Sequence, residues 1–214
     1  MYLTQLILNP RSRRARAELT QPYEMHRTLM RAFGDDLTDE RVLYRVDIDR
    51  ATGIPVVLVQ SCNEPDWSFL EKTDSYLLDN GDEENPTQKR FSIDTSKGQA
   101  LVFRLRANPT VKRNGKRLGL FDEQDQLAWL QRKAEQGGFQ ILSATVRPEG
   151  LEQRQKHDKD KQHGTGESVS MTHYAVRFDG HLRVTDPELF AATIAAGIGP
   201  AKAFGFGLLS VAPV

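Results

Sequence analysis

The residues best suited to chemistry lie in one short stretch that contains Tyr23, His26, Arg27 and Arg31. In a helix, residues three or four apart are neighbours, so Tyr23 adjoins His26 and Arg27 adjoins Arg31. An imidazole can take or give a proton near neutral pH, and an arginine can hold phosphate oxygens through two hydrogen bonds. These groups suit attack by a ribose 2′-hydroxyl on its own 3′-phosphate. The alternative is that His26 is an ordinary half-buried histidine.

A helix from about Pro22 to residue 33 is expected to position these side chains, because proline suits a first turn and Gly34 suits a helix end. Met25 and Leu29 fall on one face of this helix. The polar side chains of Tyr23, His26, Arg27 and Arg31 therefore lie beside this apolar face, at the edge of the core. His26 stands in the first turns, where the helix dipole favours a bound phosphate.

A second candidate is the glycine-rich loop, which we define as residues 197–207. It follows a predicted helix and precedes a predicted strand, the reverse of a Rossmann or P-loop motif, so neither kind of nucleotide site fits. Glycines allow an RNA backbone to approach the chain closely, but a tight turn required by packing would also need them. The residues of this loop that we expect to bind RNA are Gly197, Gly199, Lys202, Gly205 and Gly207.

The third candidate is a basic strand followed by a basic hairpin in residues 104–117. Asn114-Gly115 is typical of a hairpin tip. A basic two-stranded ribbon can lie along a nucleic-acid groove, whereas the alternative is an exposed hairpin that only aids solubility. The cations assigned to RNA are Arg104, Arg106, Lys112, Arg113, Lys116 and Arg117.

The charges are unevenly distributed, although 29 basic and 29 acidic residues give a net charge of zero. Residues 1–34 carry six cations and two acidic residues, and residues 95–121 carry seven cations and no acidic residue. Two basic blocks can form one positive face, which favours nucleic-acid binding, although two solvated surfaces would look the same. The cations of the first block are Arg11, Arg13, Arg14, Arg16, Arg27 and Arg31.

Several classes of protein are disfavoured. Cys62 is the only cysteine, so the chain has no internal disulfide and no cysteine-ligated metal site. His157 and His163 lie in a polar segment without a rigid ligand frame, and we expect neither a metal nor a cofactor. No apolar run approaches the roughly 18 residues of a membrane span, and the N-terminus does not read as a secretory signal. We therefore expect a cytoplasmic protein without a membrane partner.

The predicted elements follow the order β-α-β-β-α-β twice, which indicates an α+β protein with two tandem ferredoxin-like domains. We place the N-terminal domain at residues 1–94 and the C-terminal domain at 95–214. Strands are expected at 2–8, 41–48, 54–60, 90–93, 100–106, 139–146, 172–178, 182–184 and 206–211, with a turn at Asp179-Gly180. Further helices are expected at 66–72, 122–136 and 187–196. Residues 148–169 are expected to form a long mobile loop.

Nearly the whole chain resembles the CasE family of type I-E CRISPR systems. The resemblance runs through MYLTQLIL, PYEMHRTLM, FRLRANP, QLAWLQRK and, most specifically, the closing GIGPAKAFGFGLLSVAP. It implies a double ferredoxin-like fold and metal-independent cleavage of CRISPR precursor RNA at the base of the repeat stem-loop. It also implies that the enzyme keeps the product stem-loop and joins the other protein subunits of Cascade, with no DNA contact required for cleavage.

The resemblance places the catalytic histidine of the family on His26, with Tyr23 and Arg31 as its partners. His26 would act as general acid or base, Arg31 would stabilise the phosphorane, and Tyr23 would position the ribose or phosphate. The alternative function is a non-catalytic RNA-binding module, because paired ferredoxin-like domains often bind RNA. Against it, neither half carries the aromatic RNP1 pattern.

Overall fold

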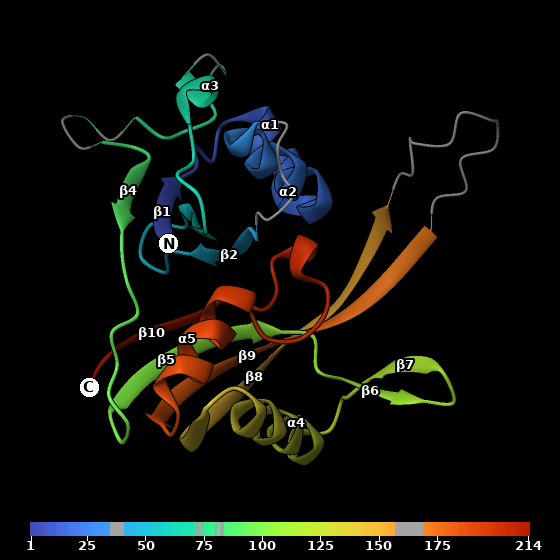
Figure 1. The fold of residues 1–214 in the computed structure, drawn as a ribbon. Coiled ribbons are helices and arrows are strands. Elements are labelled where there is room, and N and C mark those ends of the chain that lie inside the picture. The colour runs from blue at the N-terminus through green and yellow to red at the C-terminus, as the bar shows by residue number, and fades with distance from the viewer. Residues whose placement is uncertain (35–40, 72, 74, 80, 82–83, 157–168) are drawn as a thin grey trace.

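The structure is a computed structural model that describes all residues except 35–40, 72, 74, 80, 82–83 and 157–168. Two four-stranded antiparallel sheets lie one above the other, with helices on their outer sides (Figure 1). The strand order is β2-β3-β1-β4 in the first sheet and β10-β5-β9-β8 in the second. Both are the order of a ferredoxin-like domain, so the prediction of two such domains is confirmed.

Among the described residues, the N-terminal half packs three α-helices and one short 3-10 helix on its sheet. Its apolar core joins Leu6 and Val57 from the strands to Met25 and Leu29 from the second helix. The elements are β1 (Tyr2–Ile7), α1 (Arg13–Thr20), α2 (Pro22–Met30), the short 3-10 helix η1 (Arg31–Phe33), β2 (Leu43–Ile48), β3 (Pro55–Ser61), α3 (Ser68–Glu71) and β4 (Thr87–Arg90).

The C-terminal half repeats this arrangement around a larger core, in which Phe103, Phe178 and Phe190 are buried. Asp122 and Asp186 cap its two helices by accepting hydrogen bonds from first-turn backbone N–H groups, as short acidic side chains do at helix starts. The elements are β5 (Ala100–Ala107), β6 (Thr110–Arg113), β7 (Lys116–Gly119), α4 (Glu123–Gln136), β8 (Phe139–Lys156), β9 (Val169–Val184), α5 (Pro187–Ala196), η2 (Lys202–Phe204) and β10 (Leu209–Pro213).

The prediction of a long loop at 148–169 is wrong for its described residues. Strand β8 continues to Lys156 and pairs with β9 from Val169 onwards, past an irregularity between Pro148 and Gly150. This ribbon extends beyond the core, and Leu151 on it is exposed. A strand outside the core needs no apolar alternation, so the sequence pattern did not reveal it. Residues 157–168, with His157 and His163, lie outside the described residues.

The predicted turn at Asp179-Gly180 is also wrong, because β9 runs through it without a break. A Cβ at Gly180 would lie 2.0 Å from the Ser143 carbonyl oxygen of β8. The strands shift register next to this point, between Ile141 and Ser143. The glycine therefore permits a close approach between strands at a bulge, and it does not mark a hairpin tip.

Two predicted strands are displaced along the chain. The strand expected at 90–93 lies at Thr87–Arg90, where it pairs with β1, and the one expected at 206–211 lies at Leu209–Pro213, where it pairs with β5. Glycine conformations explain the second displacement, because Gly205 and Gly207 both have positive φ. An extended strand cannot begin until after them.

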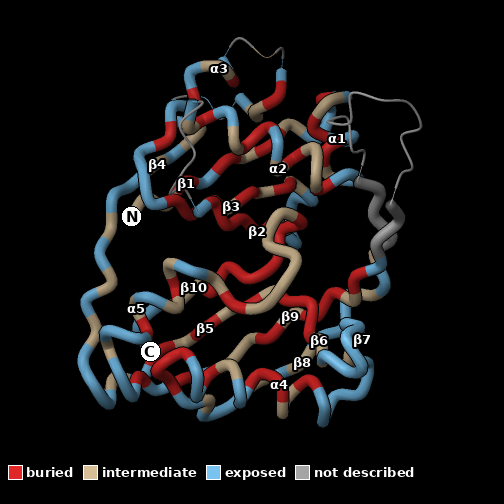
Figure 2. The backbone as a smooth tube through the Cα atoms, turned by 45° about the vertical axis from the view of Figure 1, so that its right-hand side comes forward, coloured by how far each residue is buried: buried red, intermediate tan, exposed pale blue. Residues whose placement is uncertain are grey.

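The hairpin β6–β7 stands away from both cores, and Figure 2 shows it largely exposed. Asn114 and Gly115 at its tip have φ values of 48° and 76°. Two central residues with positive φ are what a tight two-residue hairpin turn requires. The predicted basic hairpin is therefore confirmed as a structural element.

Candidate functional site

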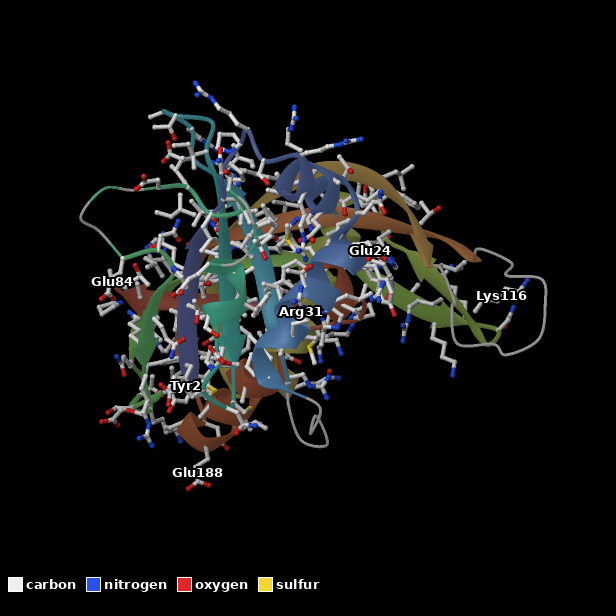
Figure 3. All side chains as sticks on the ribbon, turned by 90° about the horizontal axis from the view of Figure 1, so that it is seen from above. Tyr2, Glu24, Arg31, Glu84, Lys116 and Glu188 are labelled. Carbon is white, nitrogen blue, oxygen red and sulfur yellow. The ribbon has the colours of Figure 1, made fainter. Side chains whose placement is uncertain are left out.

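Helix α2 positions the candidate catalytic residues. Pro22 occupies its first turn, and Met25 and Leu29 are each 1% exposed, so the apolar face is fixed in the core as predicted. His26 and Tyr23 are half-buried beside that face. Figure 3 shows Arg31 farther along the same helical segment than Glu24.

His26 lies in a partly apolar environment formed by aromatic rings. Its ring stacks on Tyr44 with a centroid distance of 6.3 Å and an angle of 14°, and the Tyr23 ring lies at 6.4 Å. Nδ1 of His26 is buried and has no hydrogen-bond partner among the described residues. Burial lowers the pKa of His26 below its ordinary value of 6.5. The imidazole is therefore neutral at pH 7 and ready to accept a proton.

Tyr44 connects this helix to the glycine-rich loop of the other domain. Its hydroxyl donates a hydrogen bond to the Pro22 carbonyl at 2.6 Å, and the Ala203 carbonyl lies 3.4 Å away. The rings of Tyr23 and Phe204 are 5.9 Å apart. The first turn of α2 therefore rests on η2, and His26 stands where the two domains meet. Sequence reasoning missed Tyr44, because a tyrosine within a buried strand looks like any core residue.

Close packing explains why each of these positions in the glycine-rich loop is a glycine. A Cβ at Gly197 would lie 2.7 Å from Leu43, and one at Gly207 would lie 2.8 Å from the Ile198 carbonyl oxygen. A Cβ would approach Tyr44 to 3.1 Å from Gly205 and would approach Trp129 to 3.1 Å from Gly199. The packing alternative is thus supported at these positions. The contact of the same glycines with RNA remains a prediction.

Arg31 and Arg27 make other contacts in this structure. The Arg31 guanidinium carbon lies 4.4 Å from the centre of the Phe69 ring, and Arg27 forms an ion pair with Glu24 at 3.1 Å. Both arginines are exposed. The structure thus brings Tyr23 to His26, while it holds Arg31 on an aromatic surface of the N-terminal domain.

Of the four arginines in and just before α1, one is held by contacts within the protein and three are exposed. Arg14 donates to Glu18 at 2.8 Å and to Thr28 at 2.9 Å, and Glu18 also accepts from the Tyr76 hydroxyl at 2.6 Å. Arg14 therefore ties α1 to α2 within the protein. The exposed arginines are Arg11, Arg13 and Arg16.

The two arginines of β5 face a cleft of about 1800 Å³ between the sheets, where acidic partners meet them. Arg106 pairs with Glu149 at 2.6 Å and Glu152 at 2.5 Å, and Arg104 pairs with Asp179 at 2.5 Å. Burial would lower the pKa of Arg106, but the two carboxylates outweigh it and raise that pKa. The protein itself neutralises much of this charge. In contrast, the hairpin cations Lys112, Arg113, Lys116 and Arg117 are all exposed.

A buried polar pair behind the glycine-rich loop was also missed. The Asn108 side-chain nitrogen lies 3.0 Å from His173 Nδ1, and the Asn108 oxygen accepts from the Tyr174 backbone N–H at 3.3 Å. The His173 ring packs on Phe204 at 4.9 Å. Asn108 thus ties β9 to the end of β5, and His173 on β9 packs against the loop that touches α2. A polar residue directly before Pro109, at the end of an apolar strand, was the available sequence clue.

No cluster of three or more His, Cys, Asp or Glu suited to a metal ion occurs among the described residues. Within that part of the chain, no helix is both long and apolar enough to span a membrane.

The fold and the site define a double ferredoxin-like protein with a neutral histidine at the junction of its halves. The chain belongs to the family described as "CRISPR associated protein", whose sequence profile matches residues 1–213. It is 43% identical to the CRISPR-associated endoribonuclease Cse3 of Thermus thermophilus, over the full length of both chains. A solved structure of CRISPR endoribonuclease Cse3 bound to 19 nt RNA shares 41% identity, with a TM-score of 0.85 and complete coverage of both chains. The CRISPR system Cascade subunit CasE of Escherichia coli is 29% identical, again over both full lengths.

Proposed function

We propose that this protein is an endoribonuclease that cleaves CRISPR precursor RNA at the base of the repeat stem-loop. The observation that carries the proposal is His26, a half-buried imidazole with a lowered pKa at the junction of the two domains. The full-length similarity to an enzyme named as a CRISPR-associated endoribonuclease supports it. The glycine-rich loop touches the first turn of α2, and the basic hairpin offers a further surface that suits an RNA backbone.

The reaction is an internal transesterification. A ribose 2′ oxygen attacks its adjacent phosphorus in line and forms a new P–O bond, while the bond from phosphorus to the next 5′ oxygen breaks. The electron pair of that bond leaves with the 5′ oxygen, which takes up a proton. The products are a 2′,3′-cyclic phosphate and a 5′-hydroxyl end.

His26 acts as the general base, because its lowered pKa leaves it neutral and able to take the 2′-hydroxyl proton at pH 7. Since Nδ1 is buried, the proton moves to Nε2. Such proton transfer typically accelerates a reaction about 10²–10⁴-fold. Tyr23 positions the ribose or phosphate beside the imidazole. Arg31 stabilises the phosphorane after leaving the Phe69 ring.

The RNA stem lies along the exposed hairpin β6–β7, where four cations meet its phosphates. The exposed arginines of α1 and Lys202 extend this contact toward His26. Duplex form and 2′-hydroxyl groups supply recognition of RNA, as expected for an A-form helix. After cleavage the protein keeps the stem-loop and joins the other Cascade subunits in the cytoplasm, as the name of the Escherichia coli relative suggests. Cleavage requires no DNA contact.

Incubation with repeat RNA in excess EDTA tests this function. We expect one cut at the 3′ side of the stem base, with cyclic phosphate and 5′-hydroxyl ends. A strict need for Mg²⁺ or Mn²⁺ would overturn the mechanism. Tight binding of the RNA without any cleavage would instead identify a non-catalytic RNA-binding module.

A further inference from the structure

Helix α4 carries the motif QLAWLQRK, which the proposed mechanism does not use. Trp129 is 2% exposed and packs beneath the glycine-rich loop, because a Cβ at Gly199 would lie 3.1 Å from its ring. Lys133 follows one helical turn later and is half-buried. Residues four apart share a helix face, so Lys133 lies on the side of α4 that supports the loop.

The other side of the glycine-rich loop rests on the start of β2. A Cβ at Gly197 would lie 2.7 Å from Leu43, the first residue of that strand. Arg41 precedes Leu43 by two residues and is exposed. The loop that carries Lys202 therefore passes between the start of β2, which follows Arg41, and the face of α4 that carries Lys133.

The backbone of the loop fixes the position of Lys202. Ala201 before it has a φ of 64° and Gly205 after its short helix has a φ of 78°, both left-handed. This conformation is uncommon for alanine, and such strain gathers at functional sites. The Lys202 side chain also lies along Gly207, where a Cβ would approach its Cγ to 3.4 Å.

Arg41 and Lys133 each lie close enough to Lys202 to repel its charge. Burial lowers the pKa of Lys202, and the positive charges of Arg41 and Lys133 lower it further. In the part of the chain that the structure describes, no carboxylate forms an ion pair with any of the three. Cations gathered from three separate segments without a counter-ion favour the binding of an anion.

We propose that Lys202, Arg41 and Lys133 form one site that holds a single backbone phosphate of the RNA. This inference rests on the proposed function and adds two residues, Arg41 and Lys133, to it. The site clamps the RNA across both domains beside the loop that supports α2. It therefore acts in binding the substrate and takes no part in the proton transfer at His26.

A double-mutant cycle tests the site. The dissociation constant for repeat RNA is measured in the His26→Ala background for Arg41→Gln, Lys133→Gln and the double variant, at several salt concentrations. Arg132→Gln is the matched control, because Arg132 is exposed on the same helix. We expect each single variant to weaken binding about 10-fold. The double variant should weaken it by far less than about 100-fold, because both cations hold the same phosphate.

Salt dependence and rescue sharpen the test. Loss of one phosphate contact lowers the slope of log K against log salt by about 0.7–0.9, and the double variant should lower it no further than the singles do. Lys133→Arg should retain most of the affinity, which excludes a folding defect at that position. The shared site would be overturned if the Arg41→Gln and Lys133→Gln variants bound RNA as tightly as Arg132→Gln. It would also be overturned if the loss of affinity in the double variant equalled the product of the two single losses. Failure of the wild-type protein to cleave repeat RNA would instead overturn the proposed function.

Discussion

Gly207→Ala separates the two explanations of the glycine-rich loop. Gly207 has a φ of 91°, and a Cβ there would lie 2.8 Å from the Ile198 carbonyl oxygen. That oxygen is part of the backbone and cannot rotate away. If packing explains this glycine, the substitution lowers the stability of the protein. If the glycine only allows RNA to approach closely, the substitution weakens RNA binding. The stability of the protein then falls only by the ordinary cost of a positive φ at an alanine.

Gly98→Ala is the matched control, because Gly98 has a φ of 89° and a Cβ there would have no other atom within 4 Å. A left-handed conformation costs an L residue about 1–2 kcal/mol, and both variants bear that cost. The steric overlap at Gly207 adds about 1–3 kcal/mol, the usual range for overpacking. For a chain of this size, 1 kcal/mol shifts the unfolding midpoint by about 2–4 °C. Gly207→Ala should therefore unfold about 2–12 °C below Gly98→Ala.

Thermal unfolding followed by circular dichroism measures this difference, and RNA affinity is measured in parallel. Gly98→Ala should retain wild-type affinity, since Gly98 lies in the connection between the sheets. Equal unfolding midpoints for the two variants, together with weaker RNA binding by Gly207→Ala alone, would refute the packing explanation.

Three further predictions concern RNA binding, pH and turnover. Replacing Lys112, Arg113, Lys116 and Arg117 by alanine should weaken RNA binding and flatten its salt dependence; an unchanged slope would show that the hairpin lies away from RNA. The single-turnover cleavage rate should fall with decreasing pH, because protonation disables a base, and its midpoint should lie below 6.5 because burial lowers the pKa of His26. A midpoint at or above 6.5 would contradict that assignment. With excess RNA, product should reach a plateau near one per enzyme, because the stem contacts survive cleavage, and sustained turnover would disprove product retention.

The sequence predicted those features that depend on neighbours along the chain. The helix that carries His26 followed from Pro22, the apolar spacing of Met25 and Leu29, and Gly34. The hairpin followed from Asn114-Gly115. In each case a local preference and the tertiary fold favour the same conformation.

Features that depend on contacts between distant segments could not be predicted in this way. The stacking of Tyr44 on His26 joins β2 to α2, and the pairing of Arg106 with Glu149 and Glu152 joins β5 to a ribbon that looked like a loop. Gly180 resembled a turn residue because its close neighbour in β8 is Ser143, which lies 37 residues earlier in the sequence. Spacing along the chain carries no information about such partners.

The most direct test of the central claim is the cleavage of repeat RNA by His26→Ala, measured together with its RNA affinity. His181→Ala is the control, because His181 is exposed in the cleft and hydrogen-bonds Ser143 at 3.0 Å. If His26 is the proton carrier, His26→Ala binds the stem-loop with near wild-type affinity and cleaves at least about 10²-fold more slowly, while the control cleaves normally. Wild-type cleavage by His26→Ala would remove His26 from the active site, and a loss of folding or RNA affinity would assign it a structural role.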